Sequence, residues 1–373
     1  MLISSKMLFI KKKLQNIFKL IFYGIFKIIY GKIKGKVNIN NDDIKIKSVI
    51  FKKDISYKIF IAKKSRLYTD TINDTAIICK NQILEGASFQ YRKNVNVECE
   101  QNIVFEKGTP RVKKKLNGTV FSLLTGGGGN SNYWHWLFDV LPRLAILKKI
   151  TDLREIDFFL FPDAKEKFQI ETIEILKIPK EKILSSISVR HLYAKKIFCT
   201  DHPYNFLNDP DKDSLSIPYW IIQFLRESFL KDKFDTTLNL PKKIYIDRSD
   251  AKSGHQHRRK ILNEVKVKEF LKKEGFSFVT LGNLDFIDQV KLFNNAECIV
   301  GLHGAGFANI VFCKPNTRVI ELQSNTTGEI IENVSITNNL KYEKISVKAE
   351  TILANDQSGD IEIPIKTLES MFK

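Results

Sequence analysis

The chain has 373 residues, which is long for one ordinary domain and suits two. Hydrophobic residues make up 43% of it and charged residues 27%, and this balance excludes an intrinsically disordered chain. The formal net charge is +18, but outside the N-terminus the basic residues form no patch with aromatic residues, so nucleic acid is not an expected partner.

The N-terminal segment, residues 1–40, is basic and amphipathic. Residues 1–36 contain nine lysines and no acidic residue. The longest uncharged run is Leu20–Phe26, whereas a membrane-spanning helix needs about 20 apolar residues. Lysines alternate with Ile and Phe at helical spacing, which favours a helix in the interface of an anionic membrane over a helix packed in a domain core. We therefore expect a cytoplasmic protein, peripheral at the inner face of a membrane.

Residues 41–238 are predicted to form an N-terminal domain on the acceptor side of the site. Short alternating apolar runs between residues 45 and 120 predict strands. A glycine run, Gly126–Gly129, precedes a predicted helix at 131–150. The next predicted elements are a strand at 158–161, a helix at 165–176, a loop at 200–215 and a helix at 217–232.

Residues 239–350 alternate strands with helices, which predicts a parallel sheet wrapped by helices. The predicted strands are 243–248, 277–281, 298–304, 317–322 and 342–347. The predicted helices are 258–274, 285–295, 305–312 and 328–339. The last segment, 351–373, is expected to pack back on the N-terminal domain.

Residues suited to a nucleotide diphosphate follow the strands of this second half. Ligands of open parallel sheets bind at the carboxyl ends of the strands. An arginine there offers two parallel hydrogen bonds to phosphate, a small-residue turn with a histidine opens a helix towards an anion, and an acid can accept the ribose hydroxyls. The candidates are Arg248, His303, Gly304, Ala305, Gly306 and Glu321. Taken singly, the glycines could serve packing, and the charged residues could be solvated strand ends.

The first half contains a candidate general base. His135 and Asp139 are four residues apart, so on a helix they share a face, and a carboxylate beside an imidazole fixes its tautomer and raises its basicity. Asn132 and Trp136 would contact the acceptor or support the helix. A purely structural helix start is the alternative for the whole group, and Asp139 could itself be the base.

Together these segments resemble glycosyltransferase family 61. The resemblance rests on N-x-x-H-W-L-F-D-x-L-P-R-L at 132–144, Y-I-D-R at 245–248, G-L-H-G-A-G at 301–306 and V-I-E-L at 319–322, within about residues 120–325. It implies an α/β protein of the GT-B type, with two Rossmann-like domains facing a cleft, an inverting mechanism and a nucleotide-sugar donor. The bacterial branch, which assembles capsular and other surface polysaccharides, is the nearest in character.

No metal ion and no cofactor besides the donor substrate are expected. The two D-x-D motifs within Asp209–Asp213 read as a turn, since metal-using glycosyltransferases carry that motif after a hydrophobic strand. His255 and His257 lie in a polar loop that either covers the diphosphate or starts a solvated helix. The five cysteines show no metal-ligand spacing and suit a reducing compartment.

The expected function is therefore metal-independent, inverting sugar transfer to a glycan or lipid-linked oligosaccharide in surface-polysaccharide assembly. The partners would be a nucleotide-sugar, that acceptor and an anionic membrane surface. A pyruvyl- or phosphate-ester transferase and a non-catalytic, membrane-bound glycan-binding module are the alternatives. The sequence leaves the donor sugar, the linkage and the oligomeric state open.

Overall fold

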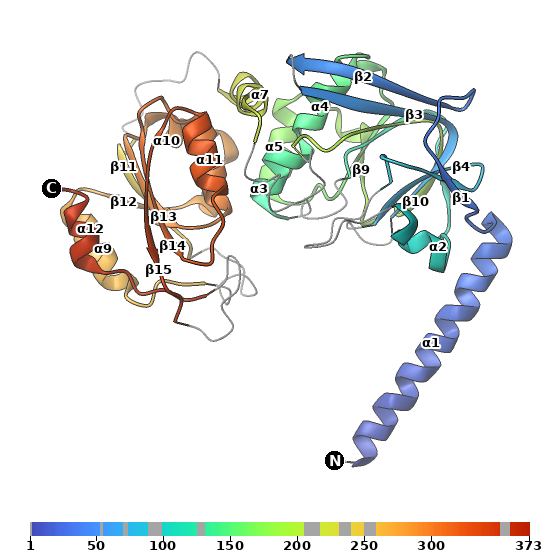
Figure 1. The fold of residues 1–373 in the computed structure, drawn as a ribbon, viewed down its shortest axis with the longest axis horizontal. Helices are drawn as coiled ribbons and strands as arrows, with labels where there is room; N and C mark the ends of the chain where they lie inside the picture. Colours follow the sequence, from blue (N-terminus) through green and yellow to red (C-terminus); the bar gives the residue numbers. More distant parts are fainter. Residues whose placement is uncertain are drawn as a thin grey trace. The chain divides into compact units, whose positions relative to one another are not determined.

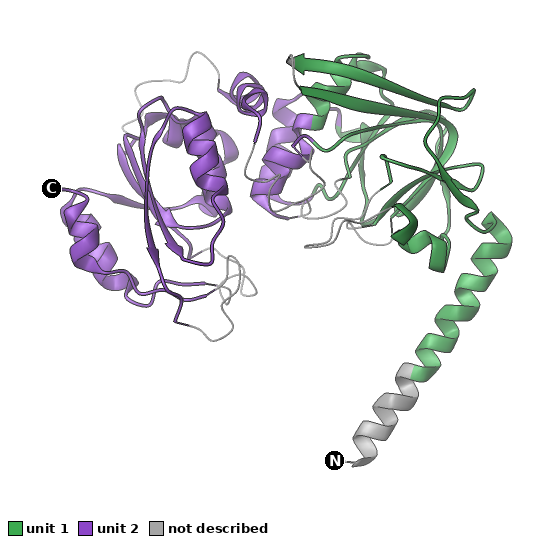
Figure 2. Ribbon diagram, in the orientation of Figure 1, with its two compact units in different colours: residues 1–130, 143–164, 180–202 green, residues 131–142, 165–179, 203–373 purple. Residues whose placement is uncertain are grey.

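A computed structural model describes residues 2–52, 55–69, 74–88, 99–124, 131–204, 217–230, 240–249, 259–350 and 359–373, with side chains from residue 13 onward. The glycine run Gly126–Gly129, the Asp209–Asp213 motifs and the loop with His255 and His257 lie outside these residues. The chain divides into two compact units (Figure 2). Unit 1 comprises residues 1–130, 143–164 and 180–202, and unit 2 comprises residues 131–142, 165–179 and 203–373.

Unit 1 is built on a mixed sheet of ten strands. The strands are β1 (Gly35–Val37), β2 (Ile44–Lys52), β3 (Ile55–Thr69), β4 (Thr75–Cys79), β5 (Gln82–Leu84), β6 (Lys114–Lys115), β7 (Thr119–Ser122), β8 (Phe158–Phe161), β9 (Ile183–Ser185) and β10 (His191–Thr200). The main order is β1-β5-β4-β3-β10-β7-β8-β9, with β2 paired to β3 and β6 to β10. Helices α1 (Leu2–Tyr30), α2 (Ile103–Lys107) and α4 (Pro142–Lys148, which begins at the border with unit 2) accompany it.

Only part of this sheet has the parallel pairing of a Rossmann-like domain. Strands β10, β7, β8 and β9 are parallel neighbours, whereas β2, β3, β4 and β5 pair antiparallel. The connection from β4 to β5 consists of Lys80 and Asn81, which both have positive φ, and a two-residue turn of this kind joins antiparallel strands. The prediction of a Rossmann-like first domain therefore fails for residues 44–84.

Unit 2 contains an open sheet of five parallel strands, as predicted. They are β11 (Lys243–Asp247), β12 (Ser277–Thr280), β13 (Cys298–Leu302), β14 (Arg318–Ser324) and β15 (Lys341–Val347), in the order β12-β11-β13-β14-β15. The chain starts at β11, adds β12 on one side and then continues from β13 on the other. In a sheet of this order, ligands bind at the switch point between the first and third strands, here β11 and β13.

Helices cover both faces of this sheet (Figure 1). One face carries α9 (Glu264–Lys273) and α12 (Ile365–Ser370), and the other carries α10 (Phe286–Asn295), the 3-10 helix η6 (Ala305–Phe312) and α11 (Ile330–Thr337). α7 (Tyr219–Phe229) packs beside η6. The core between the sheet and α9 includes Tyr245, Val300 and Leu271, all buried.

The C-terminal residues belong to unit 2, contrary to our expectation that they return to the N-terminal domain. Ile361 forms a parallel bridge with Ile261, and Ile363 and Leu368 are buried in the core beside α9. These apolar residues complete a face of the five-stranded sheet, which explains why residues 359–373 remain there.

Two segments that precede residue 203 in the chain also cluster with unit 2. Residues 131–142 contain α3 (Tyr133–His135) and the π-helical segment η2 (Trp136–Val140), and residues 165–179 contain α5 (Lys167–Ile175). The Tyr133 hydroxyl donates to Asn309 Oδ1 over 2.7 Å, and the Phe286 amide donates to Glu171 over 2.7 Å. The boundaries of the two compact units therefore differ from the single predicted domain boundary after residue 238.

All five cysteines are buried, unpaired thiols. In the described part of the chain, no helix combines the length and apolar content needed to cross a bilayer.

Candidate functional site

Arg248 follows β11 and reaches the segment that follows β13. Its guanidinium donates to the His303 carbonyl over 3.2 Å. The same group covers Gly304, because a Cβ added there would lie 3.6 Å from Arg248 Cζ. The residues predicted to bind diphosphate thus meet at the switch point of the parallel sheet.

Glycine is required by protein packing at two of the three glycine positions near this point and not at the third. A Cβ at Gly306 would approach Leu281 to 2.9 Å, and one at Gly301 would approach Ile246 to 3.1 Å, so both are needed for packing. At Gly304 a Cβ would make only ordinary contacts, and its φ of 170° suits any residue. Protein packing does not require glycine at 304, whereas close approach of a ligand to the backbone would.

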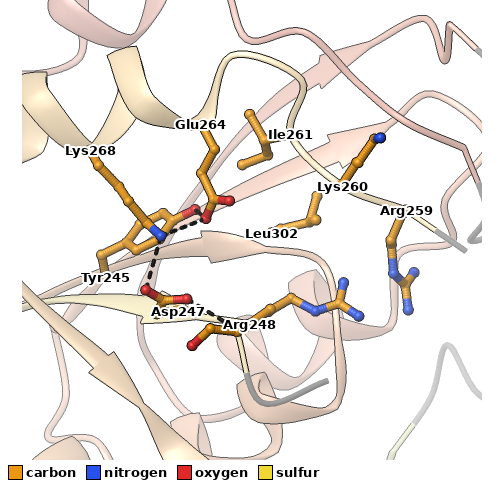
Figure 3. Close-up of a pocket in the computed structure, with 10 residues that line it drawn as sticks. Tyr245, Asp247, Arg248, Arg259, Lys260, Ile261, Glu264, Lys268 and Leu302 are labelled. Atoms are coloured by element: carbon orange, nitrogen blue, oxygen red, sulfur yellow. Dashed lines mark hydrogen bonds and ion pairs between the residues drawn. The ribbon is translucent and has the colours of Figure 1, made fainter. Parts of the chain in front are cut away.

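A pocket of about 270 Å³ opens beside Arg248 (Figure 3). Its lining comprises Tyr245, Asp247, Arg248, Ser249, Arg259, Lys260, Ile261, Glu264, Lys268 and Leu302. Four of these residues are basic and two are acidic, so the lining carries an excess of positive charge. Such a pocket attracts anionic ligands.

Within the pocket the charges are sorted by side. Lys268 pairs with Asp247 at 2.9 Å and with Glu264 at 3.1 Å. Burial is the largest single influence on Asp247 and opposes its ionisation, but the hydrogen bonds from Lys268 and Ser249 and the charge of Lys268 together outweigh burial and lower the pKa of that carboxyl. Arg248, Arg259 and Lys260 lie together on the other side (Figure 3), so three of the four basic side chains of the lining are concentrated there.

His303 and Glu321 form a buried pair at the same edge. Glu321 Oε1 bonds His303 Nδ1, and the Tyr342 hydroxyl donates to Glu321 Oε2 over 2.6 Å. Burial and the charge of Glu321 raise the pKa of the Tyr342 phenol above its usual range, so Tyr342 remains a donor. The carboxylate therefore fixes the orientation of the His303 ring.

This arrangement differs from the role predicted for Glu321. We expected it at a strand end, accepting ribose hydroxyls, but it lies inside β14, which continues to Ser324, and it is fully buried. Both of its oxygens already have protein partners. In this structure the carboxylate holds His303, and a contact with ribose stays a prediction.

His135 and Asp139 form the predicted contact. His135 Nδ1 lies 2.7 Å from Asp139 Oδ2, and the Tyr204 hydroxyl donates to Asp139 Oδ1. Burial opposes protonation of the imidazole, but the charge of Asp139 and its hydrogen bond outweigh burial and raise the pKa of His135. The side chain of Asp139 is only 5% exposed and that of His135 29%, so the histidine is the member of the pair that solvent reaches.

Asn132 and Trp136 support this segment. Asn132 caps α3, accepting from the amides of Trp134 at 2.9 Å and His135 at 3.4 Å. Trp136 is fully buried and its indole donates to Thr172 over 2.8 Å. Of the two roles predicted for this pair, acceptor contact or structural support, the geometry matches the second.

Sequence reasoning missed Tyr204 and Tyr342, which complete the two histidine–carboxylate pairs. Tyr204 lies 65 residues from Asp139 and Tyr342 lies 21 residues from Glu321, so neither contact has a local sequence signal. Another missed link is Tyr133, whose bond to Asn309 joins the His135 segment to the helix that Gly304–Gly306 opens. Ala305, the first residue of η6, is half-buried.

A family of known proteins matches the part of the chain that contains most of these residues. A search of curated proteins finds no match. A model of the glycosyltransferase 61 family matches residues 133–320, half of the chain, from the His135 segment to β14. The matched stretch includes Arg248, His303 and the Gly304–Gly306 turn. The chain therefore belongs to the glycosyltransferase 61 family.

Proposed function

We propose that this glycosyltransferase is inverting and metal-independent, has a GT-B arrangement, and moves a sugar from a nucleotide-diphosphate donor to a glycan hydroxyl in surface-polysaccharide assembly. The observation that carries the proposal is the meeting of Arg248, His303 and Gly304 at the switch point between β11 and β13, beside a positively lined pocket. Membership of the family supports a nucleotide-sugar donor.

On the donor side, the chemistry requires stabilisation of the departing diphosphate. Arg248 supplies a positive charge that is independent of pH and can form two parallel hydrogen bonds. Glu321 holds Nδ1 of His303, which orients the other ring nitrogen for a hydrogen bond with a phosphate oxygen. Backbone amides at the start of η6 become accessible where Gly304 has no side chain.

On the acceptor side, the chemistry requires removal of a proton from the attacking hydroxyl. His135 fits this role because its Nδ1 is held by Asp139, which leaves Nε2 to accept a proton. Both oxygens of Asp139 are engaged, one by His135 and one by Tyr204, so we assign Asp139 to orientation of the base. Attack on the face opposite the diphosphate inverts the anomeric centre.

The test incubates the protein with a panel of nucleotide sugars, with and without glycan acceptors. Turnover is measured as the release of nucleoside diphosphate. Wild-type protein should release it in excess EDTA, and the product should show the opposite anomeric configuration by NMR. His135→Ala should lower turnover by roughly 10²–10⁴-fold while calorimetric donor affinity stays within about twofold.

Three results would contradict the proposal. Loss of turnover in EDTA that added metal restores would show a metal-dependent mechanism. Retention of the donor's anomeric configuration would exclude direct displacement. Normal turnover in His135→Ala would leave the His135 segment with a structural role only.

A further inference from the structure

Helix α1 of unit 1 carries an apolar stripe that nothing in the described part of the chain covers. Leu20 is exposed outside this stripe, and eight other exposed apolar residues recur at spacings of three and four, which places them on one face. They are Leu14, Ile17, Phe18, Ile21, Phe22, Ile25, Ile28 and Ile29, with exposures from 41% at Phe22 to 86% at Ile28. An apolar surface of this extent on a folded protein marks an interaction site.

The side of α1 that contacts unit 1 is a different one. Phe26 is buried, and the Tyr30 ring packs edge-on against His191 with centroids 4.8 Å apart. Lys27 Nζ donates to the Glu106 carbonyl over 2.5 Å. Phe26 lies beside the edge of the stripe, where its ring centroid is 4.8 Å from that of Phe22, and Tyr30 lies further round the helix, away from the stripe. α1 extends away from the sheet of its own unit (Figure 1), and Ile28 and Ile29 at its sheet end remain exposed.

The end of α1 is firmly joined to the sheet. The Lys113 amide donates to the Tyr30 hydroxyl over 3.1 Å, and Arg66 donates to the Tyr30 carbonyl over 3.3 Å. Gly31 then turns the chain with φ of +79°, a conformation that favours glycine. The direction in which the stripe faces is therefore set by contacts with unit 1.

The charge of the segment identifies what covers the stripe. Residues 1–36 contain nine lysines and no acid. A second copy of α1 on the stripe would bring these lysines together, whereas anionic lipid head groups would neutralise them. We propose that α1 lies in the interface of an anionic bilayer, with the stripe towards the acyl chains and Phe26 and Tyr30 towards the protein.

The experiment measures pelleting of the full chain with phosphatidylglycerol–phosphatidylcholine vesicles and with phosphatidylcholine vesicles. The wild type should pellet with the anionic vesicles, and high salt should weaken this because lysine–lipid attraction is screened. A double variant on the stripe, Ile21→Glu with Ile25→Glu, should lower the partition coefficient by at least about a hundredfold.

Two controls keep the result specific. Gln15→Glu with Asn16→Glu makes the same two-charge change without removing an apolar side chain of the stripe, and it should retain clearly more of the pelleting than the stripe variant. Tyr30→Ala loosens the joint but leaves the stripe intact, so it should bind vesicles like the wild type. Far-UV circular dichroism of each variant reports its folding. Its nucleoside diphosphate affinity, measured without lipid, reports whether unit 2 is intact.

Equal pelleting of the two double variants would overturn the proposal, as would equal binding of the wild type to neutral and anionic vesicles. A dimer in light scattering that only the stripe variant abolishes would also overturn the proposal, because a second copy of the chain would then cover the stripe. None of these outcomes depends on sugar transfer, so failure here leaves the proposed function standing.

Discussion

Two histidines in unit 2 are held in the same way, each by a carboxylate that a tyrosine also contacts. His135 is held by Asp139 with Tyr204, and His303 by Glu321 with Tyr342. The four-residue spacing made the first pair predictable from sequence, because it lies on one helical segment. The second pair joins the residue that follows β13 to β14, and its geometry follows from the parallel register that sets Gly301 beside Glu321.

Asp139 should control the pH dependence of turnover. Because it raises the pKa of His135 and a base must be unprotonated, wild-type turnover should fall with decreasing pH through a value above about 6.5, the usual histidine pKa. Asp139→Asn removes the charge but keeps the size, so the acidic limb should move to lower pH and the maximal rate should fall. Measured kcat profiles from pH 5 to 9 (roughly the range over which histidines titrate) decide this. An unmoved acidic limb in Asp139→Asn would mean that another group is the base.

Glu321 should act on diphosphate binding through His303. In Glu321→Gln the negative charge beside Nδ1 is lost and the amide can turn its NH₂ towards Nδ1, so the ring is no longer held in one orientation and diphosphate affinity should fall by roughly tenfold to a hundredfold. Tyr342→Phe, which leaves the charge in place, should cost less. Calorimetry with inorganic pyrophosphate, which has no ribose, distinguishes an effect on diphosphate binding from the loss of a ribose contact. If Glu321→Gln weakens nucleoside diphosphate but leaves pyrophosphate unaffected, the carboxylate binds ribose after all.

At the scale of elements, regular alternation was predictable and local irregularity was not. The strand at 158–161 lies where the apolar run placed it, and all five strands of the second sheet were found. The π-helical turn at Trp136–Val140 was missed. Pro142 has no amide to donate to Phe138 four residues earlier, and the turn widens before it, with the Leu141 amide bonded to the Trp136 carbonyl over 3.1 Å. The antiparallel hairpins of unit 1 were also missed, because pairing direction depends on turns and not on apolar periodicity.

The start of the His135 segment depends on one cap. Asn132→Ala removes the acceptor for the Trp134 and His135 amides and should lower the free energy of unfolding by about 1 kcal/mol. Asn132→Ser, which preserves a capping oxygen, should lose much less. Urea titrations of both variants measure the difference. Equal midpoints for Asn132→Ala and the wild type would show that the segment is held by its buried tryptophan and not by its cap.

At the scale of the whole molecule, the division into units could not be read from the sequence. The strand–helix alternation that begins at residue 239 suggested one boundary, but residues 131–142 and 165–179 cluster with the later half. The contacts responsible are single side chains such as Tyr133 and Glu171, which carry no signature in sequence. Consequently, the His135 segment and the Arg248–His303 site occur in one compact unit, within the stretch that the family model matches.

The central claim is that a nucleoside diphosphate binds at the switch point of the five-stranded sheet, and calorimetric titration of Arg248→Ala tests it most directly. Lys242→Ala is the matched control, because it removes one positive charge beside the opposite end of β11, where Lys242 pairs with Glu297 at the surface. With UDP, GDP and CDP as probes, the wild type should bind at least one. Arg248→Ala should weaken that binding by at least about tenfold, and Lys242→Ala should leave it unchanged. Equal affinity in the wild type and Arg248→Ala, or equal losses in the two variants, would contradict the account.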